Sequence, residues 1–194
     1  MKKMLIIGIA MSIFSFSEGA SYIRTGINYT RNKVNISDKN VHTVLVSGEL
    51  EYLFPVYENS GFKVLTGVGI NGKIGGANIF RNIKKQNLLE IYAGPYVTPQ
   101  ISYDINDYLT ARTGFKLGVG LNVHEVFNYD LNNDTIITPS ATLGIPMTFV
   151  LGVDIGRFTS NFEIGSKLVM GNGKLLTEKN NFLLITSLSI GYKF

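Results

Sequence analysis

The sequence has no cysteine, no tryptophan and only two histidines among its 194 residues. The absence of cysteine excludes disulfide frameworks, thiolate zinc sites and cysteine nucleophiles, and two histidines are too few for a histidine-rich metal site. Charged residues make up 16% of the chain, below the usual share of about 25%. We therefore predict no metal and no cofactor. Lys2 and Lys3 contribute to the formal charge of +4, and the remaining charge is too small to predict nucleic-acid binding.

The amino terminus has the layout of a secretory signal peptide. Met1-Lys2-Lys3 precedes thirteen uncharged residues, Met4 to Phe16, which small residues follow. This order is typical of a cleaved leader, and thirteen apolar residues fall short of the roughly 20 that a membrane-spanning helix needs. We predict a signal peptide over residues 1–17, with cleavage between 17 and 20, and one domain over residues 18–194.

Apolar residues alternate with small or polar residues through the rest of the chain. The uncharged stretch from Thr135 to Val153 contains two prolines and has a period of two, which indicates a strand and not a helix. The same alternation recurs at 44–54, 62–71, 109–121, 158–170 and 182–194, and more weakly at 22–30 and 88–103. This predicts eight strands. The connections alternate between long (31–40, 72–86, 123–134, 171–180) and short (57–60, 104–107, 154–156).

The two faces of these strands predict how the sheet closes. One face is apolar, while the other carries small residues and charges of both signs. In a bilayer a sheet must close on itself to pair its backbone groups, and membrane barrels place apolar residues outside and polar residues inside. We predict an all-β fold, an antiparallel up-and-down transmembrane β-barrel of eight strands. Eight strands leave an interior that side chains alone can fill.

Prolines and aromatic residues refine this prediction. Pro95, Pro99 and Pro146 fall inside predicted strands, and proline cannot donate a ladder hydrogen bond, so we expect bulges there.

Aromatic residues near the chain ends and short turns predict one interfacial girdle on the periplasmic side. The girdle residues are Tyr22, Phe54, Tyr57, Phe62, Tyr103, Tyr108, Phe149, Phe158, Tyr192 and Phe194.

Charged residues on the polar strand faces form the first candidate site. A turn centred near Tyr57 would place Glu51 directly opposite Lys63, and unpaired charge in a narrow lumen is costly. We expect a network with two interpretations, a structural plug, which we favour, or a gated ion path. Its predicted members are Glu49, Glu51, Lys63, Glu90, Arg112, Lys116, Glu163 and Lys167.

The second long connection forms a basic segment. Residues 73–85 contain four bases, Lys73, Arg81, Lys84 and Lys85, and no acid. Basic amphipathic segments favour anionic surfaces. This segment is therefore either a contact for lipopolysaccharide phosphates or a host polyanion, or a solvated outer loop.

The C-terminal residues carry a family resemblance. The chain ends Ser-Ile-Gly-Tyr-Lys-Phe, with Tyr192 two residues before the terminal Phe194. With the leader and the alternating strands, this resembles the small eight-stranded outer-membrane barrels of the OmpA/OmpX and opacity-protein type. Ser189 stands where those families often have glycine. The resemblance implies a Gram-negative outer membrane and recognition of Tyr192 and Phe194 by the barrel-assembly machinery.

Several functions remain open on such a scaffold. Lipid A deacylases and palmitoyltransferases need a histidine beside serine or aspartate, whereas His42 precedes Thr43 and His124 precedes Glu125. We therefore predict no catalysis, and a monomeric structural or surface-interaction protein, adhesion-like, with a filled lumen. Its expected partners are outer-membrane lipopolysaccharide, the barrel-assembly machinery and a host or extracellular ligand held by the outer loops. The alternatives are a small porin-like channel, a lipid-modifying enzyme and a soluble periplasmic barrel of lipocalin shape.

Overall fold

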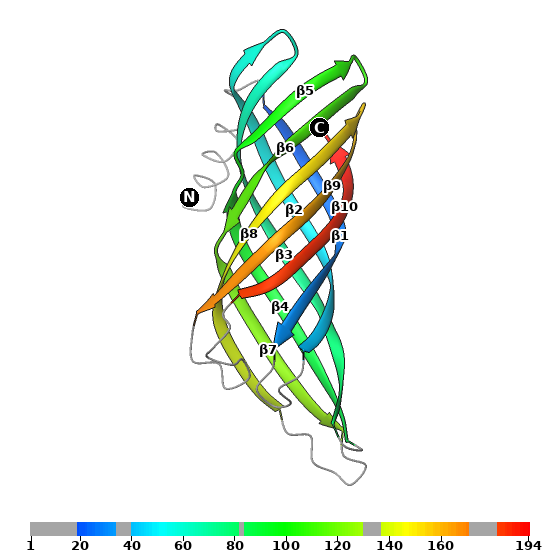
Figure 1. Ribbon diagram of the computed structural model, residues 1–194, viewed down its shortest axis with the longest axis vertical. Helices are drawn as coiled ribbons and strands as arrows, with labels where there is room; N and C mark the ends of the chain where they lie inside the picture. Colours follow the sequence, from blue (N-terminus) through cyan, green and yellow to red (C-terminus); the bar gives the residue numbers. More distant parts are fainter. Residues whose placement is uncertain (1–18, 34–39, 82–83, 130–136, 171–181) are drawn as a thin grey trace, which may run out of the picture.

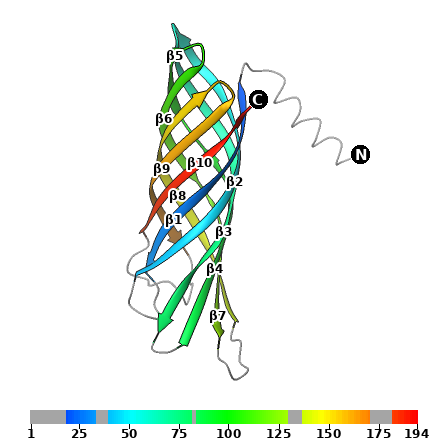
Figure 2. The same ribbon diagram turned by 90° about the vertical axis from the view of Figure 1, so that its right-hand side faces the viewer.

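A computed structural model describes residues 19–33, 40–81, 84–129, 137–170 and 182–194, so the predicted signal peptide lies outside the described residues apart from its boundary. The described chain forms ten strand segments in one tilted, closed ring (Figures 1 and 2). They are β1 (Ala20–Lys33), β2 (Asn40–Asn59), β3 (Phe62–Arg81), β4 (Lys84–Val97), β5 (Gln100–Asn106), β6 (Leu109–Gly118), β7 (Gly120–Tyr129), β8 (Ile137–Ile155), β9 (Phe158–Met170) and β10 (Phe182–Lys193). Within these ranges no helix has the length and apolar character to cross a membrane.

The ten segments amount to eight spanning strands. β3 pairs with β4 and then with β5 in one unbroken register, so β4 and β5 are one strand interrupted at Thr98 and Pro99. β6 and β7 are likewise one strand, interrupted at Val119, because both pair with β8 in one register. β10 pairs with β1 and closes the ring. The predicted eight-stranded antiparallel barrel is confirmed.

The register also fixes the tilt of the strands. The backbone pairing that starts at Ser21 on β1 crosses all eight strands and returns to β1 at Arg31, ten residues further along, by way of Tyr52, Val68, Val97, Leu117, Met147, Ser166 and Leu184. Eight strands with this stagger are tilted by about 40° from the barrel axis. The interior is then narrow enough for side chains to fill it.

The predicted bulges at Pro95, Pro99 and Pro146 are wrong. Pro95 and Pro99 each accept a hydrogen bond of 3.0 Å, from the N–H groups of Val119 and Phe115, but as prolines they cannot donate one back. Pro99 lies at the break between β4 and β5, and Pro95 faces the break at Val119, whereas Pro146 lies within the unbroken strand β8. The register on either side of each proline is unchanged. The register shifts lie elsewhere, between Pro55 and Tyr57 and between Asp104 and Asn106.

The two ends of the barrel differ. The three short turns and Phe194 lie at one end, here called the turn end, and the strand ends that flank the other four connections lie at the loop end (Figure 1). The predicted long connection 72–86 is mostly strand, since β3 continues to Arg81 and β4 starts at Lys84. The turn end corresponds to the periplasmic side of outer-membrane barrels, whose periplasmic turns are short.

The outer surface of the barrel is apolar. Ile27, Val46 and Ile70 each expose more than half of their accessible surface, with Ile27 at 61%. A soluble protein rarely exposes so large a contiguous apolar area. A closed barrel with this surface and a charged interior is an outer-membrane protein.

Aromatic residues gather on that surface at the turn end. Tyr57, Tyr103, Tyr108, Phe158 and Phe194 are exposed there. Tyr22, which we assigned to this girdle, instead points into the barrel and is only 3% exposed. Its position on β1 belongs to the lumen-facing alternation.

Candidate functional site

The lumen is the most highly charged part of the described structure. Ten charged side chains from alternate strand positions point into it, five acidic and five basic. The acids are Glu49, Glu51, Glu90, Asp154 and Glu163, and the bases are Arg24, Lys73, Arg112, Lys116 and Lys167. The formal charges of these residues therefore cancel. They form three clusters along the barrel.

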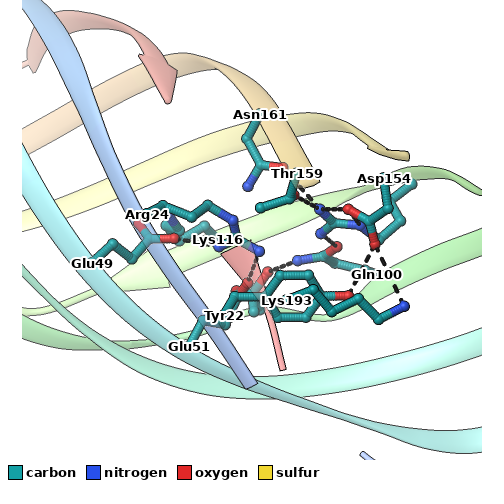
Figure 3. Close-up of polar contacts among 12 residues, drawn as sticks. Tyr22, Arg24, Glu49, Glu51, Gln100, Lys116, Asp154, Thr159, Asn161 and Lys193 are labelled. Atoms are coloured by element: carbon teal, nitrogen blue, oxygen red, sulfur yellow. Dashed lines mark hydrogen bonds and ion pairs between the residues drawn. The ribbon is translucent and has the colours of Figure 1, made fainter. Parts of the chain in front are cut away.

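The turn-end cluster is built around Arg112 on β6. Its guanidinium lies 2.7 Å from the Asp154 carboxylate on β8 and donates to the Thr159 hydroxyl on β9 at 2.7 Å. The Tyr22 hydroxyl on β1 donates to the second Asp154 oxygen at 3.0 Å. Gln100 on β5 accepts a further Arg112 bond at 3.1 Å. Five strands are thus tied together at one level of the lumen (Figure 3).

The middle cluster holds five charges in a chain. Lys116 lies 2.6 Å from Glu49 and 2.5 Å from Glu163, and Arg24 lies 2.6 Å from both Glu49 and Glu51. Glu49 is therefore shared between two cations, as Figure 3 shows for Arg24. These residues come from β1, β2, β6 and β9, which are not all neighbours in the ring.

Aromatic rings separate the charged levels. The Tyr22 ring lies between two guanidiniums, with the Arg24 and Arg112 carbons 4.5 and 4.9 Å from its centroid. The Lys116 ammonium lies 4.4 Å from the Tyr96 centroid. Cations favour the negative face of an aromatic ring, so these tyrosines both fill the lumen and stabilise its charge.

The third cluster lies toward the loop end. Lys167 on β9 lies 2.7 Å from Glu90 on β4 and donates to the Asn122 carbonyl oxygen at 3.2 Å. Lys73 on β3 donates to the Asn28 carbonyl oxygen on β1 at 2.8 Å. The ammonium groups of Lys73 and Lys167 lie 6.0 and 5.8 Å from the centroid of the Tyr92 ring.

The structure brings seven of the eight predicted lumen residues into these clusters. The exception is Lys63, which lies at the turn end with Glu58 at 2.9 Å and Asp104 at 3.4 Å. The expected opposition of Glu51 and Lys63 is wrong, because the turn falls at Ser60–Gly61 and Glu51 pairs in register with Gly69. The turn is three residues further along than a centre at Tyr57.

Three lumen charges escaped the sequence analysis. Arg24 lies in a weakly patterned strand, although its alternation with Tyr22 and Asn28 gives a usable signal. Asp154 was counted as a turn residue but ends β8 with its carboxylate inside the barrel. Lys73, assigned to the basic outer loop, lies within β3 and points into the lumen.

The other basic-loop residues flank the β3–β4 connection. Arg81 ends β3, while Lys84 and Lys85 begin β4. The side chains of all three lie outside the described part of the structure. Their proposed contact with polyanions therefore stays a prediction.

The two histidines occupy different surroundings. His42 lies exposed on the outer surface, stacked on Tyr29 with ring centroids 5.5 Å apart and hydrogen-bonded to its hydroxyl. The backbone of His124 on β7 stands in register with Glu90 on β4 and with Ser140 on β8. Across the described ranges, no three histidine or acidic side chains are grouped so that they could hold a metal ion.

The C-terminal aromatic residues form a surface cluster at the turn end, in which Phe158 and Phe194 are exposed and Tyr192 is half-buried. Tyr192 makes edge-to-face contacts with Phe194 and Phe158, at centroid distances of 5.0 and 6.1 Å. The Arg157 guanidinium donates to the Tyr192 hydroxyl at 3.1 Å. This cluster is accessible from outside the barrel, as a recognition signal must be.

Comparison with known proteins gives structural likeness only. No family model and no curated protein sequence matches the chain. Ail of Yersinia pestis, solved with the heparin analogue sucrose octasulfate, is 15% identical, with a TM-score of 0.48 and coverage of 91% of this chain and 99% of Ail. Neisserial surface protein A is 12% identical (TM-score 0.47, coverage 91% and 98%), and the outer-membrane enzyme PagL is 10% identical (TM-score 0.44, coverage 87% and 98%). All three are small outer-membrane barrels, and the likeness concerns the fold alone.

Proposed function

We propose that this protein is a structural or surface-interaction barrel of the outer membrane, without catalysis, whose lumen is closed by its own charged side chains. The ion-paired lumen is the observation that carries the proposal. Each cation of the middle cluster contacts two carboxylates at 2.5–2.6 Å. Buried charges with such partners are costly to separate, so they hold the strands together and occupy the path that a permeating ion would need.

Partners are proposed from the two ends of the barrel. The loop end faces the cell exterior, where connecting segments supply binding specificity, so a host or extracellular ligand would bind there. The exposed Phe194 and the half-buried Tyr192 would be read by the barrel-assembly machinery at the turn end. The protein is expected to be a monomer, because a closed barrel leaves no strand edge for pairing.

The proposal predicts that the purified protein does not conduct ions. After insertion into a planar lipid bilayer, the folded wild type should leave the current at the level of the bare bilayer. A porin inserted under the same conditions is the positive control. Folding is checked by a gel-mobility shift on boiling. Steady conductance steps from the folded protein would instead support a small channel.

A second candidate function, lipid modification, has one observation in its favour. The backbone of His124 lies between those of Glu90 and Ser140 on neighbouring strands. A histidine between a serine and an acid is the arrangement that activates a serine nucleophile. Glu90 also binds Lys167 at 2.7 Å, which favours a structural role for this carboxylate.

Lipid analysis separates the two functions. The proposed function predicts the same lipid A mass spectrum from cells with the wild-type protein, with His124→Ala and without the protein. Ser140→Ala serves as a second variant. A lipid A species that needs the protein and disappears in both variants would establish the enzyme instead.

A further inference from the structure

Small residues form one continuous row on the lipid-facing side of the barrel. Thr25, Gly48, Gly72 and Ala93 are successive register partners across β1, β2, β3 and β4. Thr25, the only member with a polar side chain, donates its hydroxyl proton to the Ser47 carbonyl at 3.0 Å. Four strands span about 14 Å at the usual strand spacing of about 4.8 Å. The row is thus a narrow apolar track.

Two ridges of large aliphatic residues border the row. The register places Ile23, Leu50 and Ile70 on its turn-end side, and Ile27, Val46 and Ile74 on its loop-end side. All six are exposed on the outer surface. An open hollow of about 550 Å³, here called the groove, lies over Gly48, Gly72 and Ala93, and Leu50 and Ile70 of the turn-end ridge border it.

The fold itself does not require glycine at this row. A Cβ atom on Gly48 would meet no atom within 4 Å, and one on Gly72 would meet only the Tyr92 carbonyl at 4.0 Å. On lumen-facing Gly94, by contrast, a Cβ would lie 2.2 Å from the Val119 carbonyl. Glycine in a strand interior weakens the strand, and it often marks a place that a ligand approaches closely.

Two basic residues lie on the same outer face above the groove. Arg31 and His42 are register partners, six residues beyond Thr25 and Gly48 toward the loop end, and both are exposed. Six residues extend about 20 Å along a strand, or about 15 Å along the axis at a tilt of about 40°. This equals about half the roughly 30 Å hydrocarbon core of a bilayer. A groove at mid-membrane therefore places Arg31 and His42 at headgroup level in the outer leaflet.

We propose that the groove and this basic pair together bind one phosphorylated, multiply acylated lipid of the outer leaflet. An acyl chain lies in the groove, and a lipid phosphate lies against Arg31 and His42. The outer face is convex, so a second barrel could contact it only along a narrow strip, too little for the roughly 800 Å² per partner of a stable interface. The proposal rests on the outer-membrane fold and is independent of the absence of catalysis.

The groove selects its lipid by packing and charge. Chains in a bilayer are as apolar as the groove, so there is no hydrophobic gain. The binding free energy comes instead from van der Waals contacts between an acyl chain and the groove walls, which an unfilled groove lacks. Attraction between the lipid phosphate and the basic pair adds to it. We therefore expect a modest preference for this lipid over other lipids. The groove and the basic pair should each contribute about a threefold difference in retention, in line with interaction energies measured inside membranes.

Native mass spectrometry of the folded, detergent-purified protein tests this proposal. The added probes are hexa-acylated lipid A, the same lipid without phosphates, and phosphatidylglycerol. Gly72→Leu fills the groove at a position where an added Cβ atom meets no atom closer than 4.0 Å, and Arg31→Ala/His42→Ala removes the basic pair. Ala141→Leu, an equally exposed position on β8, is the matched control. A boiling-dependent gel shift shows that each variant is folded.

The wild type and Ala141→Leu should retain one lipid A, and Gly72→Leu should retain about threefold less. Loss of the phosphates should reduce retention by the wild type to the level of the basic-pair variant. Equal retention by Gly72→Leu, or equal retention of phosphatidylglycerol, would overturn the proposal, since the lipid would then be annular only. A wild-type dimer that Gly72→Leu abolishes would make the groove a protein interface and would equally overturn it.

Discussion

Lys116→Met lowers the free energy of unfolding by about 3–5 kcal/mol, the usual cost of breaking a buried ion pair from one side. Lys116 is the bridge between Glu49 and Glu163, at 2.6 and 2.5 Å, and its side chain is almost fully buried. Methionine fills a similar volume but leaves Glu163 without its cation and Glu49 with Arg24 alone. The measurement is a urea titration in lipid vesicles, followed by far-ultraviolet circular dichroism and by the gel-mobility shift.

Two further variants isolate the cause of this loss. Lys63→Met removes an ion pair in the open turn-end region, where such pairs contribute less than about 1 kcal/mol, so its midpoint should stay near that of the wild type. Lys116→Met with Glu163→Gln removes both charges of one pair and should recover part of the stability. If Lys116→Met unfolds at the same urea concentration as Lys63→Met, the lumen pairs are not what stabilises the barrel.

Phe194→Ala reduces the amount of protein in the outer membrane several-fold, without a matching loss of stability after refolding in detergent. Phe194 is 67% exposed and makes its ring contact with Tyr192 on the surface, so little packing depends on it. The reason for the expected loss is recognition during assembly. The measurements are quantitative immunoblots of outer-membrane fractions and the refolding yield of purified protein.

Phe115→Ala is the matched control for this prediction. Phe115 is also a lipid-facing aromatic residue, 63% exposed, with an edge-to-face contact to Phe149 at 5.4 Å. It lies far from the C-terminus and should reach the membrane in normal amounts. Equal losses for the two variants would show that Phe194 acts as an ordinary surface aromatic residue and not as an assembly signal.

The sequence was sufficient to predict the barrel because its main signal has a period of two. In each strand, outward apolar residues such as Val46 alternate with inward polar residues such as Glu49. The face of a side chain therefore follows from whether its position is odd or even in that strand, here called its parity. Parity placed Lys116, Glu163 and Lys167 in the lumen. It could not decide where a strand ends, so Lys73 was assigned to a loop although it lies eight residues before the end of β3 at Arg81.

The pairs inside the lumen needed information that parity does not carry. Which charges meet across the barrel depends on the stagger of the whole ring, and each hairpin contributes to it. An unrecognised bulge between Pro55 and Tyr57 and a turn at Ser60–Gly61 were enough to misplace the partner of Glu51. Its partner is Arg24, 2.6 Å away on β1.

The pairing of β1 with β10 has a consequence for the order of folding. The Phe194 N–H donates to the Ser21 carbonyl at 2.9 Å, so the two strands farthest apart along the described chain must meet. Closing so long a loop costs conformational entropy, so the pairing of β1 with β10 is expected to form slowly and late in folding. Until that seam forms, the sheet has two open edges, and its charged face is not yet enclosed. A polypeptide in this state cannot enter lipid cheaply, so closure of the seam and entry into the membrane have to proceed as a single event.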